Sequence, residues 1–262
     1  MGWFQWFSRK SSDDTTPADP AKASNIFIKL ANKPGKPVCA EDSTTIGGND
    51  SELDPRNKMF APMQTPTKGQ RSELPTARVV SSIPRDDFTP THQPKDTQNW
   101  VYPSEQMFYN AMKRKGWTPK EEDMSNVVAI HNAVNERCWR EILAWESLHS
   151  GACGNPNLSK FQGRPKDISP KARFLNAMGY KLPFDRHDWF VNRCGTEVRY
   201  IVDFYNATPL PGQPIAMHLD VRPALDTPMA LFDRLYMQLK WTSSGRWLGE
   251  QQNQGPKTDT TR

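Results

Sequence analysis

A histidine lies in the middle of an apolar face in the stretch VVAIHNAVNERCW, residues 127–139. Read as a helix, this stretch and the next turns place one series of residues on a single face: Val127, His131, Val134, Cys138, Ile142 and Trp145. A neutral imidazole on such a face suits the iron of a flat hydrophobic cofactor such as haem, and Trp139 and Trp145 could line it. The alternative is a core histidine whose ring nitrogens bond to backbone groups, and the spacing alone favours this alternative.

An acidic residue follows on the same helix. Glu136 comes five residues after His131, which is about 140° around the helix axis. The two side chains therefore cannot lie directly beside each other on that face. Any role of Glu136 is indirect, through a substrate or through the position of the helix.

Charged residues gather further along the chain. The stretch DRHDW, 185–189, places Arg186 and His187 in an expected loop over 182–195, as a charge network or as a polar catalytic patch. Arg186, Arg193, Arg199 and Arg222 could bind carboxylates bidentately. Such a group fits the two propionates of haem, and it fits a surface ion-pair network equally well. The sequence contains no GxSxG, HExxH or P-loop motif.

The composition limits what kind of protein this is. The 262 residues are 36% hydrophobic, with a mean hydropathy of −0.77 and a net charge of +5. That is enough for one core with polar tails, and no apolar run approaches the roughly 20 residues of a membrane span. The basic residues form no block, so a nucleic-acid partner is not expected. The four cysteines include no CxxC pair and lie far apart, so disulfides are not expected either, and Cys138 is expected to be buried.

The chain divides into two tails and one folded part. Residues 1–72 are rich in Ser, Thr, Pro, Gly and Asp, which predicts a largely disordered N-terminal tail. Its first residues, MGWFQWFSRK, form an aromatic and basic tip that could contact a membrane surface or bind nothing. Residues 73–248 are the expected folded domain, and 249–262 are an expected disordered C-terminal tail.

Local signals predict the elements of this domain. Helices are expected to begin after Ser104, Ser169 and Thr227, and a capping box at Thr118–Glu121 is expected to begin the long helix, which runs to about His149. Residues 151–159 are an expected loop. The alternating stretches 196–205 and 215–223 predict a hairpin with one buried and one polar face. The result is an α+β fold, a single domain in which several helices pack on a small antiparallel sheet.

Several motifs resemble those of one protein family. WVYPSEQMFYNAMKRKGW, AIHNAVNERCWREILAWE, LPFDRHDW, EVRYIVDFY and LDVRPALD occur in the order found in mitochondrial holocytochrome c synthases, also called cytochrome c haem lyases. The resemblance covers about residues 56–240. One family feature differs here, because Cys39 is followed by Ala40 and not by the proline of the family's Cys-Pro motif.

The resemblance implies a function. Such a lyase binds haem b as a co-substrate and joins its vinyl groups to the CxxCH cysteines of apocytochrome c or c1 as thioethers. It lies on the intermembrane-space side of the mitochondrial inner membrane, attached peripherally. His131 would ligate the haem iron and Glu136 would take part in function, while Trp100 and Tyr102 would receive the N-terminal helix of the apocytochrome. A non-enzymatic haem chaperone that delivers haem to cytochrome assembly is the alternative.

Overall fold

The fold combines a long helix, a four-stranded sheet and several shorter elements, and it confirms the predicted α+β class. The computed structural model describes residues 63–90, 93–207 and 217–244. In chain order the elements are β1 (Val80–Pro84), β2 (Asn99–Val101), α2 (Glu105–Arg114), α3 (Met124–Glu146), β3 (Asn157–Gly163), α4 (Pro170–Ala177), β4 (Asp185–Arg193), β5 (Thr196–Asn206), β6 (Met217–Pro223) and α5 (Pro228–Ser243). Short 3₁₀ turns at Glu121–Asp123 and Ser147–His149 flank α3.

The predicted tails lie mostly outside the described residues. This applies to the aromatic tip and to the whole of 249–262. Residues 63–72 are described, and Gln70 bonds through its side-chain amide to Gln106 on α2 at 2.8 Å. The domain boundary at residue 72 stays a prediction.

The larger sheet is antiparallel throughout, in the order β3-β4-β5-β6, and β1 and β2 form a separate pair. The expected hairpin is present as β5 and β6. The prediction of a loop over 182–195 was wrong, because 185–193 form the central strand β4. The loop expected over 151–159 ends earlier than predicted, because β3 begins at Asn157. Charged residues on alternate positions of β4 concealed the strand, since Trp189 and Val191 supply its apolar face and Arg186 and Asp188 the other.

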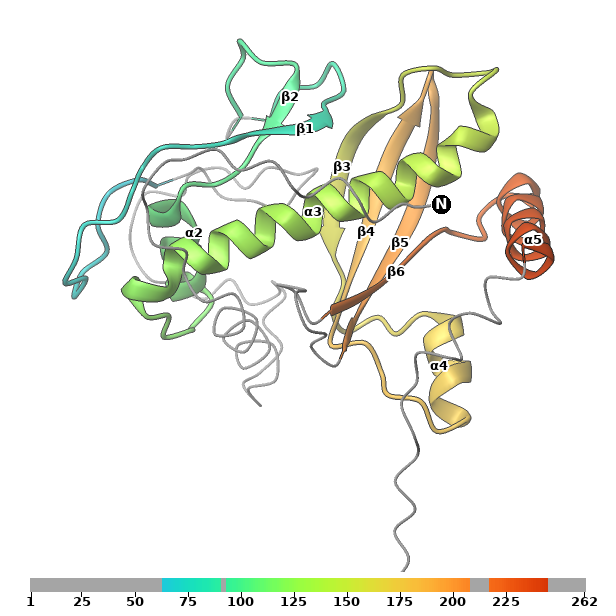
Figure 1. Cartoon of the computed structure of the whole chain (residues 1–262). Coiled ribbons are helices and arrows are strands. Elements are labelled where there is room, and N and C mark those ends of the chain that lie inside the picture. Colours follow the sequence, from blue (N-terminus) through green and yellow to red (C-terminus); the bar gives the residue numbers. More distant parts are fainter. Residues whose placement is uncertain (1–62, 91–92, 208–216, 245–262) are drawn as a thin grey trace, which may run out of the picture.

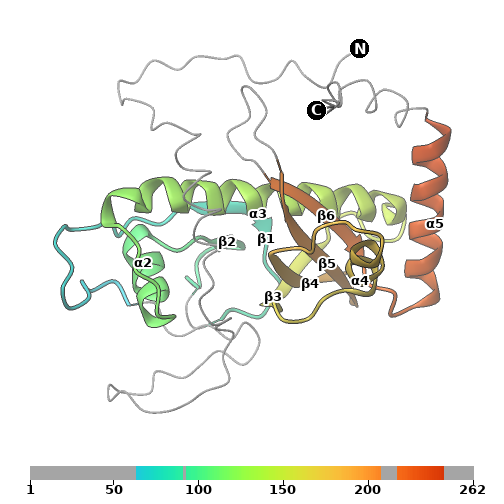
Figure 2. The ribbon, with the colours of Figure 1, turned by 90° about the horizontal axis from the view of Figure 1, so that it is seen from below.

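Helix α3 packs its C-terminal half on the apolar face of this sheet (Figure 1). Val134, Cys138 and Ile142 are buried there against strand residues such as Tyr200 and Val202. Each fully buried side chain of this size contributes about 1.5–3 kcal/mol. The free thiol of Cys138 is fully buried, as expected. The N-terminal half of α3 extends beyond the sheet and lies beside α2 (Figures 1 and 2).

The opposite face of the sheet is charged but also buried, which corrects the expectation of a polar, open face. Asp188 and Asp203 are completely buried, and Arg186 and Arg222 nearly so. Arg222 Nη2 contacts Asp203 Oδ2 at 2.5 Å, and the hydroxyl of Ser169 at the start of α4 donates to the same oxygen at 2.7 Å. Buried carboxylates require such partners, because an unpaired buried charge costs about 3–5 kcal/mol.

Three of the four expected helix starts are confirmed. The hydroxyls of Ser104, Ser169 and Thr227 each accept a backbone N–H in the first turn of α2, α4 and α5. The capping box at Thr118 is not formed. The carboxylate of Glu121 instead accepts the backbone N–H groups of Arg71 and Ser72, which belong to a segment 50 residues earlier in the chain.

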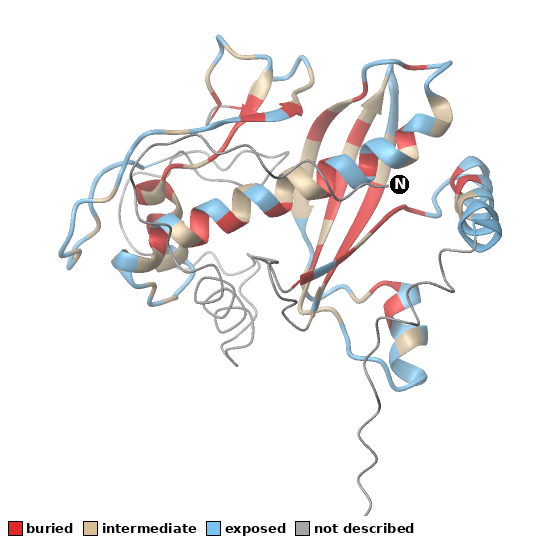
Figure 3. Ribbon diagram, in the orientation of Figure 1, coloured by how far each residue is buried: buried red, intermediate tan, exposed pale blue. Residues whose placement is uncertain are grey.

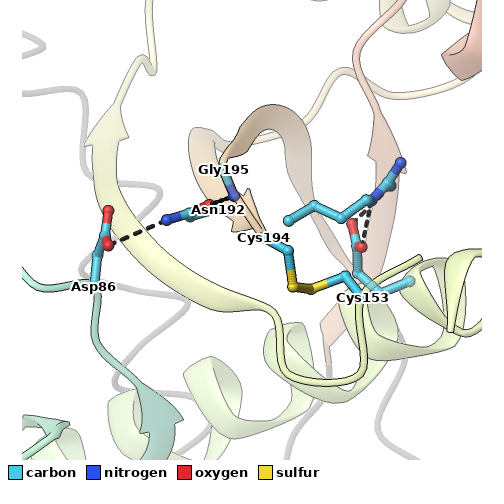
Figure 4. Close-up of a disulfide and its surroundings, with 7 residues drawn as sticks. Asp86, Cys153, Asn192, Cys194 and Gly195 are labelled. Atoms are coloured by element: carbon cyan, nitrogen blue, oxygen red, sulfur yellow. Dashed lines mark hydrogen bonds and ion pairs between the residues drawn. A yellow bond between two sulfur atoms is a disulfide. The ribbon is translucent and has the colours of Figure 1, made fainter. Parts of the chain in front are cut away.

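A disulfide joins Cys153 to Cys194, contrary to the expectation that disulfides are absent. The antiparallel turn between β4 and β5 brings Cys194 to the loop that follows α3, with the two Cα atoms 5.6 Å apart (Figure 4). Asn192 supports the same turn by accepting the backbone N–H of Gly195 at 2.6 Å. The separation of 41 residues along the chain hid this pairing from the sequence.

We expect Cys153→Ser to lower the free energy of unfolding by about 4 kcal/mol, because the bridge closes a long loop in the unfolded chain. Thermal unfolding of wild type and variant, each with and without dithiothreitol, measures this. The reductant should lower the Tm of the wild type and leave that of the variant unchanged. A wild-type Tm that does not respond to the reductant would contradict the expectation.

Candidate functional site

His131 lies on α3 where the helix leaves the sheet, and its ring is half-buried. Two aromatic rings contact it edge-on: Tyr102, which follows β2, at a centroid distance of 5.9 Å, and Phe108 on α2, at 5.1 Å. The histidine is therefore held between the helix pair and the β1–β2 segment.

Two asparagine side chains bond to the two nitrogens of this ring. The Oδ1 atom of Asn132 lies 3.1 Å from Nδ1, and the Nδ2 atom of Asn135 lies 3.2 Å from Nε2. A carboxamide oxygen only accepts and a carboxamide nitrogen only donates. Nδ1 therefore carries the proton, and Nε2 presents its lone pair.

Burial keeps this imidazole neutral. Burial is the largest cause that lowers the pKa of His131 to about 4; the electrostatic effects of His187 and Lys115 also lower it, and the hydrogen bond to Asn132 raises it. A neutral ring with an available nitrogen lone pair is the form that binds a metal ion.

Glu136 makes no hydrogen bond to His131 within the described residues and bonds instead to Tyr102 and Ser82. One carboxylate oxygen accepts the hydroxyl of Tyr102 at 3.0 Å and the backbone N–H of Ser82 at 3.0 Å, and the other accepts the hydroxyl of Ser82. Burial, and then the charge of Glu136, raises the pKa of Tyr102. The glutamate thus ties strand β1 and the ring of Tyr102 to α3, and Tyr102 in turn contacts His131.

His187, on β4, is the second histidine that bears on this site. Its Nε2 atom is 3.2 Å from a carboxylate oxygen of Asp185, and its ring packs edge-on against Phe204 at 5.2 Å. Its charge is among those that lower the pKa of His131. His187 and His131 therefore share one electrostatic neighbourhood, although no direct bond joins them.

Three of the predicted aromatic site residues have structural roles. Trp139 and Trp100 are buried in the core, and Trp100 donates its indole N–H to the Leu158 carbonyl at 3.0 Å. Trp145 is partly buried and donates to the Val221 carbonyl at 2.9 Å. The apolar stripe of α3 therefore packs mainly against the sheet, and only its His131 end lies beyond it. The proposed haem contacts of Trp139 and Trp145 and the substrate contact of Trp100 stay predictions.

The four predicted arginines are engaged in ion pairs. Arg193 binds both oxygens of Glu146, at 2.6 and 2.9 Å. Arg186 and Arg199 share Asp188, and Arg222 binds Asp203. These contacts match the alternative interpretation, an ion-pair network. The arginines bind different carboxylates and do not converge on one site for the two propionates through these contacts.

Sequence reasoning missed the residues that surround His131. Phe108, Asn132 and Asn135 were not singled out, although both asparagines occur within one helical turn of the histidine. Within the described ranges, no group of three or more His, Cys, Asp or Glu side chains could hold a metal ion. No helix in these ranges combines the length and apolar character needed to cross a bilayer.

Comparison with known proteins identifies relatives along most of the chain. The family described as "Cytochrome c/c1 heme lyase" matches residues 6–238. The chain is 48% identical over 206 residues to the human holocytochrome c-type synthase, which covers 76% of this chain and 74% of the relative. It is 34% identical over 269 residues to the Saccharomyces cerevisiae holocytochrome-c synthase, covering 94% and 97%. A putative holocytochrome-c1 synthase of Schizosaccharomyces pombe is 48% identical over 185 residues, covering 70% and 80%. No solved structure matches.

The low pKa of His131 predicts a specific pH dependence of stability. The unfolded chain, with a histidine pKa of about 6.5, binds this proton more readily than the folded chain. Stability should therefore fall as the pH drops from 6.5 towards 4, by about 3 kcal/mol from this residue alone. Urea unfolding of wild type and His131→Gln across this range isolates the effect, since other titrating groups are common to both. Equal slopes for the two proteins would show that the pKa of His131 is not lowered in the folded chain.

Proposed function

Since the chain belongs to the cytochrome c/c1 heme lyase family, we propose that it attaches haem covalently to apocytochrome c or c1. The products are thioethers between the two haem vinyl groups and the cysteines of the CxxCH segment. In each addition the sulfur bonds to one vinyl carbon and a hydrogen to the other, so nothing leaves. Haem is thus a substrate that departs with the cytochrome.

The observation that carries this proposal is the state of His131. Its imidazole is neutral, its Nε2 lone pair accepts the amide of Asn135 within the described residues, and aromatic rings border it. Asn132 holds the proton on Nδ1, as second-sphere groups do for metal-bound histidines. The residues present therefore fit a haem iron, provided that the amide of Asn135 gives up its contact with Nε2.

The rest of the chain's contribution is orientation. The vinyl groups and thiols carry the chemistry, so a protein that holds them together raises the rate mainly through proximity. With iron held from one side by His131, the histidine of the CxxCH segment would bind from the other and bring its cysteines to the vinyl groups. Tyr102 and Glu136 serve as positioning residues, because they fix the ring beside which the haem must lie.

The proposed place of action is the intermembrane-space side of the mitochondrial inner membrane, with peripheral attachment. The Cys153–Cys194 disulfide supports a compartment that is not reducing, since disulfides seldom persist in the cytosol. The aromatic N-terminal tip is one proposed contact with the membrane.

His131→Ala should abolish both haem binding and product formation, because it removes the proposed iron ligand. Purified wild type and variant are incubated with reduced haem and a peptide that carries CxxCH. The wild type should show a Soret band and yield a haem adduct that survives acid–acetone extraction. His218→Ala, on the exposed outer edge of β6, is the matched control and should behave as wild type.

Two other results would decide against the proposal. A wild-type Soret band without any extraction-resistant adduct would favour the haem chaperone. A Soret band that His131→Ala retains at full strength would remove the iron ligand from this site.

Asn132→Ala should weaken haem binding about 10–100-fold, because the proton on Nδ1 then lacks its acceptor and the ring loses its orientation. Asn132→Asp keeps an acceptor oxygen at this position and should retain tight binding. Titration of each protein with haem, followed in the Soret band, measures the affinities. Equal affinities for Asn132→Ala and Asn132→Asp would mean that Nδ1 is not oriented by this side chain.

A further inference from the structure

Helix α5 is oriented in the opposite sense to an ordinary amphipathic surface helix: its apolar side faces solvent and its charged side faces the domain. The side chains that it buries include the carboxylate of Asp233, whereas Leu231, Leu235 and Leu239 are exposed. Most of the ribbon of α5 is coloured as exposed (Figure 3). Phe232 is 65% exposed and Leu239 68%, which is far more than large apolar side chains of a packed helix show. At 100° per residue, the exposed apolar positions from Met229 to Leu239 cover nearly half of the helix circumference.

Polar contacts fix this orientation. Asp233 Oδ2 lies 2.9 Å from Nε2 of His149, just after α3, and both side chains are largely buried. Arg234 donates through Nε to the carbonyl of Pro223 at the end of β6, at 2.7 Å. The helix is therefore docked by its charged side, and its apolar arc is directed away from the domain.

Helix α4 and the residues after it expose a second apolar group. Both views place α4 and α5 at the end of the molecule farthest from α2 (Figures 1 and 2). We call the exposed apolar residues of the two segments the α4–α5 surface: Phe174, Met178, Tyr180, Leu182, Met229, Leu231, Phe232, Leu235, Tyr236 and Leu239. A surface with this many large apolar side chains marks an interaction site.

The charged residues around this surface that lack an ion-pair partner among the described residues are all basic. Its acidic residues are already paired, Asp226 with Arg199 and Asp233 with His149. Arg173, Lys181 and Lys240 are exposed and have no ion-pair partner among the described residues. A second copy of the chain would bring the same positive charges face to face, whereas an anionic surface would neutralise them.

We propose that the α4–α5 surface rests on the interface of an anionic lipid bilayer. Leucine and phenylalanine side chains enter the boundary of the acyl chains, Tyr236 lies at the headgroups, and the basic side chains reach the lipid phosphates. This inference rests on the proposed membrane location and identifies the part of the chain that makes the contact. It assigns the attachment to folded helices in addition to any contribution of the N-terminal tip.

The test uses the full chain and vesicles of phosphatidylcholine, alone or mixed equally with phosphatidylglycerol. Leu231→Gln, Leu235→Gln and Leu239→Gln are combined in one variant, and Val79→Gln with Val80→Gln is the control, since both valines are exposed at the start of the distant strand β1. We expect the triple variant to lose at least about tenfold in vesicle partitioning and the control to bind as wild type. Arg173→Glu, Lys181→Glu and Lys240→Glu together should abolish the preference for the anionic vesicles.

Three results would overturn the inference. The wild type could fail to bind either vesicle, the triple variant could partition as the wild type does, or light scattering could show a wild-type dimer that the triple variant loses while vesicle binding is unchanged. Haem attachment in detergent solution reports separately on the proposed function. A failure of vesicle binding with intact haem attachment therefore rejects the surface and leaves the lyase.

Discussion

The packing of α3 on the apolar face of the β3–β6 sheet is the contact on which the other features depend. Val134, Cys138 and Ile142 fill that contact, and the helix is longer than the sheet is wide. Its N-terminal half therefore projects beyond the sheet and carries His131 to the border between two apolar clusters. The position of the candidate iron ligand thus follows from how far the helix extends past the core.

The environment of His131 keeps its imidazole neutral, which is the form that the proposed iron ligand requires. Burial removes the proton that would compete with iron, and the two asparagines decide which nitrogen keeps the remaining one. Glu136 connects this end of α3 to β1 and Tyr102, so the site depends on segments that are more than 30 residues apart. A change at Glu136 should therefore reach the histidine through Tyr102 and not through direct contact.

The two faces of the sheet show two different kinds of burial. One face is apolar and gains stability from the hydrophobic effect, whereas the other holds Asp188, Asp203 and their arginines in a closed ionic layer. Such a layer adds little net stability, but each charge requires its partner in place. It thereby fixes the strand register and the docking of α4, and it explains why these arginines are occupied inside the fold.

The sequence by itself determined what depends on near neighbours along the chain. Ser104, Ser169 and Thr227 cap their helices, the alternation over 196–205 makes a strand, and the stripe on α3 packs against a core, because each signal acts within a few residues. Ordered motifs also identified the family. Only the tertiary structure decided the partner of Cys153, the strand character of 185–193, the closing of the charged face and the outward direction of Leu235 on α5. Each of these depends on a contact between segments distant in sequence, and such contacts are chosen by the energy of the whole fold and not by local propensity.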